Sequence, residues 1–550
     1  MMNTDKATNS ASSIYDTGLG RQAANFAALS PLSFLPKAAA IHPDRVSVIY
    51  NDWRSTWRET YDRCRRLASA LRKHGIGKGD TVAVMAPNIP AIYEAHFGVP
   101  MSGAVLNTLN TRLDKESIGF QLAHGEAKVV IADREYGPVI TAALEGIQNP
   151  PLIIDIADPA FPEGQAFGAI EYEGFLRTGD PDFVWSLPDD EFYPIALNYT
   201  SGTTGNPKGV VTHHRGAYLN AVSQVLSWGM PNHSVYLWTL PMFHCNGWCF
   251  PWAIALNAGT SVCQRGVVAD VILQDIGKYG VTHMCGAPIV YNMLINAAAG
   301  KKIATDQPVF GLVAGAAPPA STIERAEAIG FDITHVYGLT ETYGPVSVCV
   351  KQADWNGLEL ADRAKMNARQ GVASAMQEDM VVLNPQTMKP VPHDGETIGE
   401  IMFRGNITMC GYLKNAEATE DAMQNGWFRT GDLAVTEPDG YIRIKDRSKD
   451  VIISGGENIS SLEIEDVLHR HPAVDLAAVV ARADEKWGEV PYAFIEIRNG
   501  MQVTPDELHT FCREQLAGFK IPKGFVIGDI PKTSTGKTQK FTLREIARGI

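Results

Sequence analysis

The first third of the chain alternates between helical and extended patterns of apolar residues. Residues 57–74 carry Tyr61, Cys64, Leu67 and Leu71 at helical spacing, and Gly75 follows as a stop signal. Residues 80–85 are typical of a buried strand, residues 90–101 of a helix, and the order of helix then strand returns at 117–124 and 128–132. Alternation of this kind predicts a parallel sheet covered by helices.

A second alternation, separate from the first, follows in the middle of the chain. Residues 150–190 are rich in Pro, Gly and acidic residues without a clear period, which is typical of a surface connection with at most a small peripheral strand pair. The patterns beyond it predict strands at 194–199, 235–239, 260–263, 282–285, 310–313 and 332–337, and helices at 269–279, 289–298 and 321–329. We therefore expect two α/β subdomains.

The pattern of predicted elements changes after about residue 370. Short alternating strands at 380–383, 399–403, 433–436 and 441–444 indicate a small antiparallel barrel or sandwich. From about residue 450 a compact α+β segment follows, with helices at 461–470 and 505–516 and strands at 474–481 and 490–497. The expected fold is α/β, with a large N-terminal domain and a small C-terminal one.

Composition narrows the class of protein. The chain has 550 residues and a net charge of -13, which argues against a general nucleic-acid or membrane-surface binder. Its eight cysteines include no CxxC pair, and Cys245 and Cys249 lack the partners of a zinc site. The N-terminus is polar, no run reaches the ~18 apolar residues of a membrane span, and the C-terminal residues are not a peroxisomal tripeptide. We expect a cytoplasmic location.

One glycine- and hydroxyl-rich loop is suited to bind phosphate. Glycines let successive backbone N–H groups face one anion, hydroxyls add donors, and a lysine adds positive charge. Its members are Thr200, Ser201, Gly202, Thr203, Thr204, Gly205, Lys208 and Gly209. It is not a Walker loop, because Lys208 is followed by Gly209, and it contains no Gly-x-Gly-x-x-Gly. Composition alone leaves a flexible surface loop as the alternative.

The full string from Tyr199 to Gly209 resembles the signature loop of the adenylate-forming enzymes. This superfamily includes acyl-CoA synthetases, carrier-protein adenylation domains and luciferase-like enzymes. The resemblance covers roughly residues 30–545, with the family motifs in order. It implies that the loop holds the β- and γ-phosphates of ATP, and that the N-terminal domain consists of two α/β subdomains plus a small β-barrel.

Further motifs at strand ends extend the resemblance. Open α/β sheets bind ligands at the carboxyl ends of strands. His244 and Trp248 match walls of the acyl pocket, although a lone histidine is more often a core residue. The segment Gly315-Ala316-Ala317 matches the one against adenine, with Gly315 also bordering the acyl pocket. The segment Tyr337-Gly338-Leu339-Thr340-Glu341 places a ring, a hydroxyl and a carboxylate together at the nucleotide.

Glu341 is the expected magnesium residue. A carboxylate beside ATP is useful only if it holds a cation, because otherwise it repels the phosphates. By resemblance, Thr200 and Glu341 are the Mg²⁺-associated residues, and both are catalytic candidates together with Lys537. A helix-capping glutamate is the structural alternative.

The second half of the chain supplies the other expected contacts. By resemblance, Asp432 accepts the ribose hydroxyls, and Ile444 and Arg447 complete the nucleotide site. Lys449 matches the hinge position, and Lys537 matches the lysine that contacts the α-phosphate and the acyl carboxylate. The loop expected to meet CoA comprises Ser454, Gly455, Gly456 and Glu457. Some relatives carry a second lysine where this chain has Ile453, so no role is assigned there.

These matches imply an N-terminal ATP- and acyl-binding domain at 1–446, a hinge at 447–450 and a mobile C-terminal domain at 451–550. The implied activity is that of an ATP-, Mg²⁺- and CoA-dependent acyl-CoA ligase releasing AMP and PPi. The alternatives are a carrier-protein or other adenylating enzyme, an aryl-acid CoA ligase, a phosphotransferring ATPase with ADP as product, and a silent scaffold. The expected partners are a small carboxylic acid, ATP and CoA, with a homodimer as candidate assembly.

Gly338 suggests the length of the acyl group. Strictly acetate-using relatives place Trp there, so Gly implies an open pocket floor. The string Pro-Met-Phe-His-Cys-Asn-Gly-Trp at 241–248 resembles short- and medium-chain ligases, including bacterial 3-methylmercaptopropionate–CoA ligases. We expect unbranched acids of about four to eight heavy chain atoms, because such chains pack on an aromatic wall.

Overall fold

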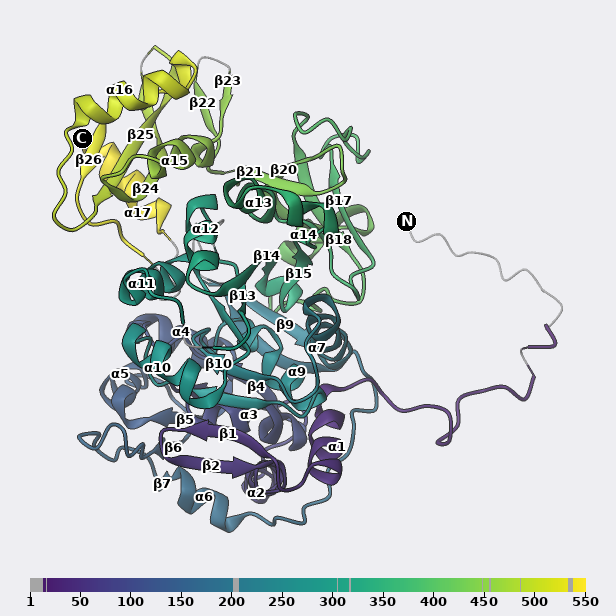
Figure 1. The fold of residues 1–550 in the computed structure, drawn as a ribbon. Coiled ribbons are helices and arrows are strands. Elements are labelled where there is room, and N and C mark those ends of the chain that lie inside the picture. The colour runs from purple at the N-terminus through teal and green to yellow at the C-terminus, as the bar shows by residue number, and fades with distance from the viewer. Residues whose placement is uncertain are drawn as a thin grey trace.

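The computed structural model describes residues 13–15, 17–200, 207–303, 305–315, 318–447, 449–454, 457–484, 486–532 and 538–550. Within these ranges the chain forms two large mixed sheets, a four-stranded antiparallel sheet and a five-stranded sheet. In Figure 1 the two large sheets form the lower body, and the C-terminal elements, in yellow, lie above it.

The first large sheet carries the strand that leads into the glycine-rich loop. Its eight strands have the order β19-β9-β8-β4-β3-β5-β6-β7. Their bounds are β3 Thr81–Met85, β4 Val105–Thr108, β5 Ala127–Asp133, β6 Leu152–Ile156, β7 Ile170–Glu171, β8 Pro194–Tyr199, β9 Gly209–His213 and β19 Gly411–Tyr412. The small peripheral strand pair allowed for 150–190 is confirmed as β6 and β7, and β6 also pairs in parallel with β5, so the pair extends the main sheet.

The helices of this half pack against one another and against the sheet. They are α2 Trp57–Lys73, α3 Pro90–Met101, α4 Lys115–His124, α5 Gly137–Ala143 and α6 Tyr172–Thr178. Helix α3 is buried along nearly its whole length, and α2 contacts both α3 and α6. Continuous burial is expected for a helix between a sheet and a second helix layer.

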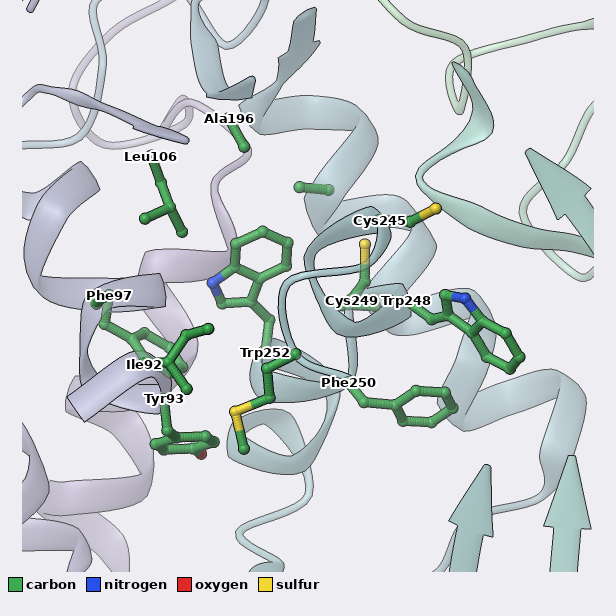
Figure 2. Close-up of a cluster of buried hydrophobic side chains, with 14 of the residues drawn as sticks. Ile92, Tyr93, Phe97, Leu106, Ala196, Cys245, Trp248, Cys249, Phe250 and Trp252 are labelled. Atoms are coloured by element: carbon green, nitrogen blue, oxygen red, sulfur yellow. The ribbon is translucent and has the colours of Figure 1, made fainter. Parts of the chain in front are cut away.

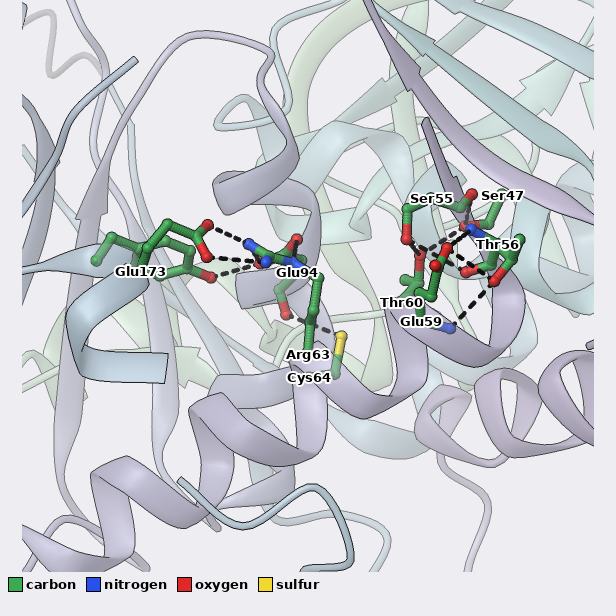
Figure 3. Close-up of polar contacts among 10 residues, drawn as sticks. Ser47, Ser55, Thr56, Glu59, Thr60, Arg63, Cys64, Glu94 and Glu173 are labelled. Carbon is green, nitrogen blue, oxygen red and sulfur yellow. Dashed lines mark hydrogen bonds and ion pairs between the residues drawn. The ribbon is translucent and has the colours of Figure 1, made fainter. Parts of the chain in front are cut away.

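Specific polar contacts fix the N-terminus of helix α2 and attach the helix to its neighbours (Figure 3). Thr56 accepts a hydrogen bond from the backbone N–H of Glu59, and Glu59 accepts one from that of Thr56, which is a capping box. One turn later, Arg63 lies 2.6 Å from the buried carboxylate of Glu94 and 2.5 Å from that of Glu173. These contacts join α2 to α3 and α6 and neutralise a buried charge.

The second large sheet has nine strands in the order β16-β15-β14-β13-β12-β10-β11-β1-β2. Their bounds are β1 Val46–Tyr50, β2 Trp53–Thr56, β10 Val235–Trp238, β11 Thr260–Cys263, β12 His283–Gly286, β13 Val309–Val313, β14 Phe331–Leu339, β15 Gly344–Val348 and β16 Val372–Ala373. The expected strands of the second alternation are confirmed to within two residues at each end, and the N-terminal strand β1 joins them beside β11.

The helices of the second half of the N-terminal domain follow the same alternation. They are α1 Phe34–Ile41, α7 His214–Trp228, α8 Cys245–Trp248, α9 Phe250–Leu256, α10 Ala269–Tyr279, α11 Pro288–Ala298, α12 Ala320–Ala328 and α13 Leu360–Asn367. Helix α7 directly follows β9, and the sequence pattern did not predict it.

The remaining elements form two smaller units. The antiparallel sheet holds β17 Asp379–Leu383, β18 Gly399–Arg404, β20 Phe428–Thr436 and β21 Ile442–Arg447, with α14 Ala416–Ala422 nearby. The C-terminal unit holds β22 Ile452–Ser454, β23 Glu457–Ile459, β24 Val474–Asp484, β25 Gly488–Ile497, β26 Phe525–Ile527, α15 Ser461–His469, α16 Pro505–Gln515 and α17 Lys540–Arg548.

The apolar cores divide at the same place as the elements. Buried clusters built from residues 452–547 are separate from those built before residue 447. The expected fold class, a large N-terminal α/β domain with a small C-terminal domain, is confirmed. None of the helices in the part of the chain that the structure describes is long and apolar enough to cross a membrane.

Candidate active site

The glycine-rich loop starts from a β-hairpin. Strands β8 and β9 pair up to Tyr199 and Gly209, and the backbone N–H of Thr200 donates to the carbonyl of Lys208 at 3.0 Å. Residues 201–206, with Ser201, Gly202, Thr203, Thr204 and Gly205, lie outside the described residues. The hairpin therefore holds both ends of the loop, with Thr200 and Lys208 at its base.

Glu341 lies on a 3-10 turn, Thr340–Thr342, at the end of β14. Its Oε1 accepts a hydrogen bond from the hydroxyl of Tyr412 at 2.8 Å. Burial raises the pKa of Glu341 above its usual value, and the Tyr412 hydroxyl opposes that shift. Lys208 also contacts Tyr412, with its Nζ 4.6 Å from the ring centre, and its charge lowers the pKa of Glu341. The structure thus brings together two expected residues, Lys208 and Glu341, through one that sequence reasoning missed.

No sequence signal singles out Tyr412. It follows a glycine in a two-residue strand, far along the chain from both of its contacts. Its place next to them depends on the pairing of β19 with β9, where Tyr412 faces Val210. Such long-range pairing is not encoded in local spacing.

A second cluster joins three expected nucleotide residues. The Tyr337 hydroxyl donates to Asp432 at 2.5 Å, and Arg447 Nε lies 3.1 Å from the other oxygen of Asp432. They come from β14, β20 and β21, and Asp432 is buried. Burial and the nearby carboxylate raise the pKa of Tyr337 well above its usual value, so it remains a donor. Ile444 lies half-buried on β21, with its N–H bonded to Gln370.

The structure places a steric constraint on Gly338 that the sequence analysis did not foresee, while its place at the acyl pocket stays a prediction. A β-carbon at this position would lie 1.9 Å from the backbone carbonyl oxygen of Gly344. Strands β14 and β15 approach so closely here that a side chain needs a backbone shift. The glycine is therefore explained by strand packing, and a tryptophan at 338 would distort the hairpin before it could fill a pocket.

The segment expected to wall the acyl pocket has an unusual backbone. Cys245, Asn246, Gly247, Trp248 and Cys249 all have positive φ, between 42° and 64°. This left-handed turn includes α8, whose Asn246 and Gly247 do not have the backbone angles of a regular helix. Figure 2 shows Cys245, Trp248 and Cys249 on this turn beside Phe250 and Trp252. Trp248 is buried, and its side chain packs against Gly344.

The turn lies next to the Glu341 segment. Cys245 Sγ is 3.5 Å from the hydroxyl of Thr340, and burial raises the pKa of this thiol to about 12. Asn198, Cys245, Asn246, Thr340 and Tyr343 border a narrow space that is too tight to admit water. The interior on this side of Glu341 is closely packed.

The remaining expected residues are only partly described. Gly315 is exposed at the end of β13 with a φ of +87°, and Ala316 and Ala317 lie outside the described residues. Leu339 is half-buried at the end of β14. Within the expected hinge, Lys449 is exposed and its carbonyl accepts a hydrogen bond from Arg544.

The expected CoA loop lies in the hairpin of β22 and β23. Ser454 is buried and pairs with the exposed Glu457, whereas Gly455 and Gly456 lie outside the described residues. Lys537 also lies outside them, shortly before α17.

The described donors are compatible with Mg²⁺. No cluster of three or more His, Cys, Asp or Glu that could hold a metal occurs among the residues that the structure describes. Thr200 and Glu341 offer hard oxygen donors, and Mg²⁺ commonly takes one or two protein oxygens and completes its shell with phosphates and water. The site fits a metal that arrives with a nucleotide.

Comparison with known proteins places this geometry in a family. Residues 35–413 match the AMP-binding enzyme family, and residues 463–537 match the C-terminal domain of AMP-binding enzymes. An acetate/butyrate–CoA ligase of Arabidopsis thaliana, named as peroxisomal, is 52% identical over 96% of this chain and 95% of its own. An acetate–CoA ligase of Humulus lupulus is 50% identical over 96% of both chains.

Solved structures agree. The o-succinylbenzoate CoA synthetase of Bacillus subtilis, in complex with its acyl-adenylate intermediate, matches with a TM-score of 0.79 and 27% identity, over 93% of this chain and 97% of that one. The chain therefore belongs to the AMP-binding enzyme family, and it is an acid–thiol ligase of the AMP-forming acyl-CoA type.

Proposed function

We propose that this ligase forms CoA thioesters of short, unbranched aliphatic acids. The observation that carries the proposal is the identity of 52% and 50%, over nearly full length, to enzymes named for acetate, butyrate and CoA.

The reaction has two steps. A carboxylate oxygen of the acid attacks the α-phosphorus of ATP, the bond to the β-phosphate breaks, and PPi leaves. The sulfur of CoA then attacks the acyl carbon, the bond to AMP breaks, and the thiol proton passes to solvent. The acid is its own nucleophile, so the protein has to position the reactants and stabilise charge.

The roles follow from the contacts described above. Asp432, held by Tyr337 and Arg447, presents a buried carboxylate for the ribose hydroxyls. Thr200 and Glu341 hold Mg²⁺, which would neutralise charge on the phosphates, and Lys208 adds a cation at the loop. Lys537 contacts the α-phosphate in the first step, and the loop around Ser454 meets CoA in the second.

In this proposal the acyl chain binds next to the turn at 245–249. We propose that Trp248 and Cys245 limit chain length, so that acids of about two to six heavy chain atoms are preferred, because longer chains would displace packed side chains. The thioether acid 3-methylmercaptopropionate lies at the upper end of this range. Cytoplasmic location and a homodimer also stay proposals, and one of the relatives is named as peroxisomal.

The test is CoA-dependent PPi release with a panel of acids. Acetate, propionate, butyrate, 3-methylmercaptopropionate, hexanoate, dodecanoate and benzoate are compared by kcat/KM. We expect an optimum between acetate and 3-methylmercaptopropionate. An optimum at dodecanoate or benzoate would contradict the short-chain proposal, and ADP in place of AMP and PPi would contradict the reaction itself.

Trp248→Ala tests the chain-length limit in the same panel. It opens space next to the turn, so its optimum should move toward hexanoate while the acetate value falls. Trp53→Ala, at an exposed tryptophan on β2, is the matched control and should leave the profile unchanged.

A further inference from the structure

A segment from the second half of the chain closes the edge of the nucleotide site. The backbone N–H of Met409 donates to the carbonyl of Glu341 at 2.8 Å, and that of Leu413 donates to the carbonyl of Gly209 at 2.7 Å. The segment thus binds to the turn that carries Glu341 and to the strand that follows the phosphate loop. Tyr412 lies between these two attachments.

The side chain of Tyr412 makes a different contact with each neighbour. Its hydroxyl donates to Glu341 Oε1 at 2.8 Å, and its ring centre lies 4.6 Å from Lys208 Nζ. The backbone of Tyr412 is fixed by a hydrogen bond from its N–H to the Thr419 hydroxyl at 2.9 Å. Burial and the carboxylate raise the pKa of Tyr412 far above neutral pH, so the hydroxyl stays a donor.

The two contacts serve two charges of opposite sign. A carboxylate that accepts a hydrogen bond at one oxygen is fixed in rotation and keeps its other oxygen for a cation. A lysine over an aromatic face is restrained without being neutralised, so its charge stays available for phosphate. The positive charge of Lys208 also acts on Glu341, whose pKa it lowers, so the ring restrains a lysine that lies close to the carboxylate.

We propose that Tyr412 is a positioning residue that orients Glu341 for Mg²⁺ through its hydroxyl and restrains Lys208 for the phosphates through its ring. The inference rests on the proposed roles of Glu341 and Lys208 in binding Mg²⁺ and ATP. The hydroxyl contacts Glu341 and the ring contacts Lys208, so the two effects can be tested by different substitutions of Tyr412.

The test measures ATP binding without acid, by calorimetry over a series of MgCl₂ concentrations. Tyr412→Phe keeps the ring and should raise the half-saturating Mg²⁺ concentration about tenfold, the effect expected for one hydrogen bond to a charged group. Its ATP affinity at saturating Mg²⁺ should stay near wild type. Tyr412→Leu also removes the ring and should weaken ATP binding even at saturating Mg²⁺.

Two controls make the test specific. Tyr61→Phe removes a half-buried hydroxyl that accepts a hydrogen bond from Trp185, and it should bind Mg²⁺ and ATP as wild type does. In a Glu341→Gln background, Tyr412→Phe should add nothing further to the Mg²⁺ dependence, because the carboxylate it acts on is gone.

The outcomes separate this inference from the proposed function. Wild-type Mg²⁺ dependence in Tyr412→Phe, or a full additional shift in the Glu341→Gln background, would overturn the positioning role alone. If the wild-type enzyme showed no Mg²⁺-dependent ATP binding, the proposed function of the site would fail as well.

Discussion

Several histidines in the N-terminal domain are buried in their neutral form. Burial lowers the pKa of His214 to about 3 and that of His96, His213, His283 and His335 to about 4. In the unfolded chain a histidine titrates near its ordinary pKa of about 6.5. Between these values the unfolded chain binds more protons than the folded one, so folding weakens as pH falls.

We predict that the free energy of unfolding decreases as the pH is lowered from about 6.5 to 4, and that each buried histidine contributes up to about 3 kcal/mol. His335→Gln should flatten this dependence, because it removes one titrating group whose Nδ1 bonds the carbonyl of Ala368. Urea denaturation at several pH values measures it. The exposed His393→Gln serves as control, and an equal flattening there would refute the argument.

Residues that belong to a motif were predictable, whereas their partners were not. Tyr337, Asp432 and Arg447 were each expected at the nucleotide, and the structure joins them by short polar contacts. Tyr412 was missed because its role depends on a strand pairing between distant segments. The close approach of β15 to Gly338 was not predicted, because it depends on strand packing that local sequence does not encode.

Among the elements, the left-handed turn at 245–249 is the one most dependent on its surroundings. A residue other than glycine in this conformation costs roughly 1–2 kcal/mol. The packing around the turn holds it: the Asn246 side chain accepts a hydrogen bond from Asn198, and the Cys249 thiol contacts the Tyr343 carbonyl. A strained backbone commonly persists where its neighbours fix it.

This predicts that glycine is at least as stabilising as alanine at position 246, the reverse of their usual order in a helix. Both Asn246→Ala and Asn246→Gly lose the bond to Asn198, but only glycine relieves the positive φ. The glycine variant should therefore be at least as stable as the alanine variant, by denaturation midpoint. At the exposed Gln274 in α10, alanine should instead be more stable than glycine by about 1 kcal/mol. The same order at both positions would show that the turn is unstrained.

Helices and strands could be predicted where the buried positions are apolar and recur with the period of the element. Strand β11 and helices α3 and α10 have the predicted bounds. Helix α7 was missed because its buried face carries Asn220, Ser223 and Gln224, which hydrogen-bond instead of forming an apolar stripe. The bounds of the five-residue strand β6 were not predicted, because the Pro, Gly and acidic residues around it are typical of turns and obscure its short apolar run.

At the scale of the whole molecule, contacts across residues 447–450 link the two bodies. The carboxylate of Asp446, before the expected hinge, accepts hydrogen bonds from the N–H and hydroxyl of Ser461, at 2.6 and 2.7 Å. Lys540 in turn donates to the Ser461 hydroxyl at 2.6 Å and lies three residues beyond Lys537. Rotation of the C-terminal body would have to remake these contacts.

The order of the domains could be predicted, because the pattern of predicted helices and strands changes along the chain where one core ends and the next begins. Their relative orientation could not, because it depends on side-chain pairs such as Asp446 and Ser461, or Asp450 and Arg544, which no local pattern relates. The hinge role of Lys449 therefore stays a prediction, motivated by its position in the turn that follows Arg447.

We predict that Lys449→Pro separates the two half-reactions. On the proposed roles, Lys537 and the loop around Ser454 lie in one C-terminal segment of the chain but act in different steps, which would require that segment to rotate between them. Proline fixes φ and restricts the residue before it, which should block rotation more than local chemistry. Acid-dependent PPi exchange should stay near wild type, whereas thioester formation from supplied acyl-adenylate should fall at least about tenfold.

Two variants give this test its contrast. Lys449→Ala leaves the backbone free and should keep both half-reactions, which separates rotation from loss of the side chain. Lys537→Ala should show the reverse pattern, with PPi exchange reduced about 10²–10³-fold because one charge contact at the α-phosphate is lost, and with thioester formation spared. Equal loss of both half-reactions in Lys449→Pro and Lys449→Ala would assign the effect to the lysine itself, and unchanged half-reactions in Lys449→Pro would move the pivot away from residue 449.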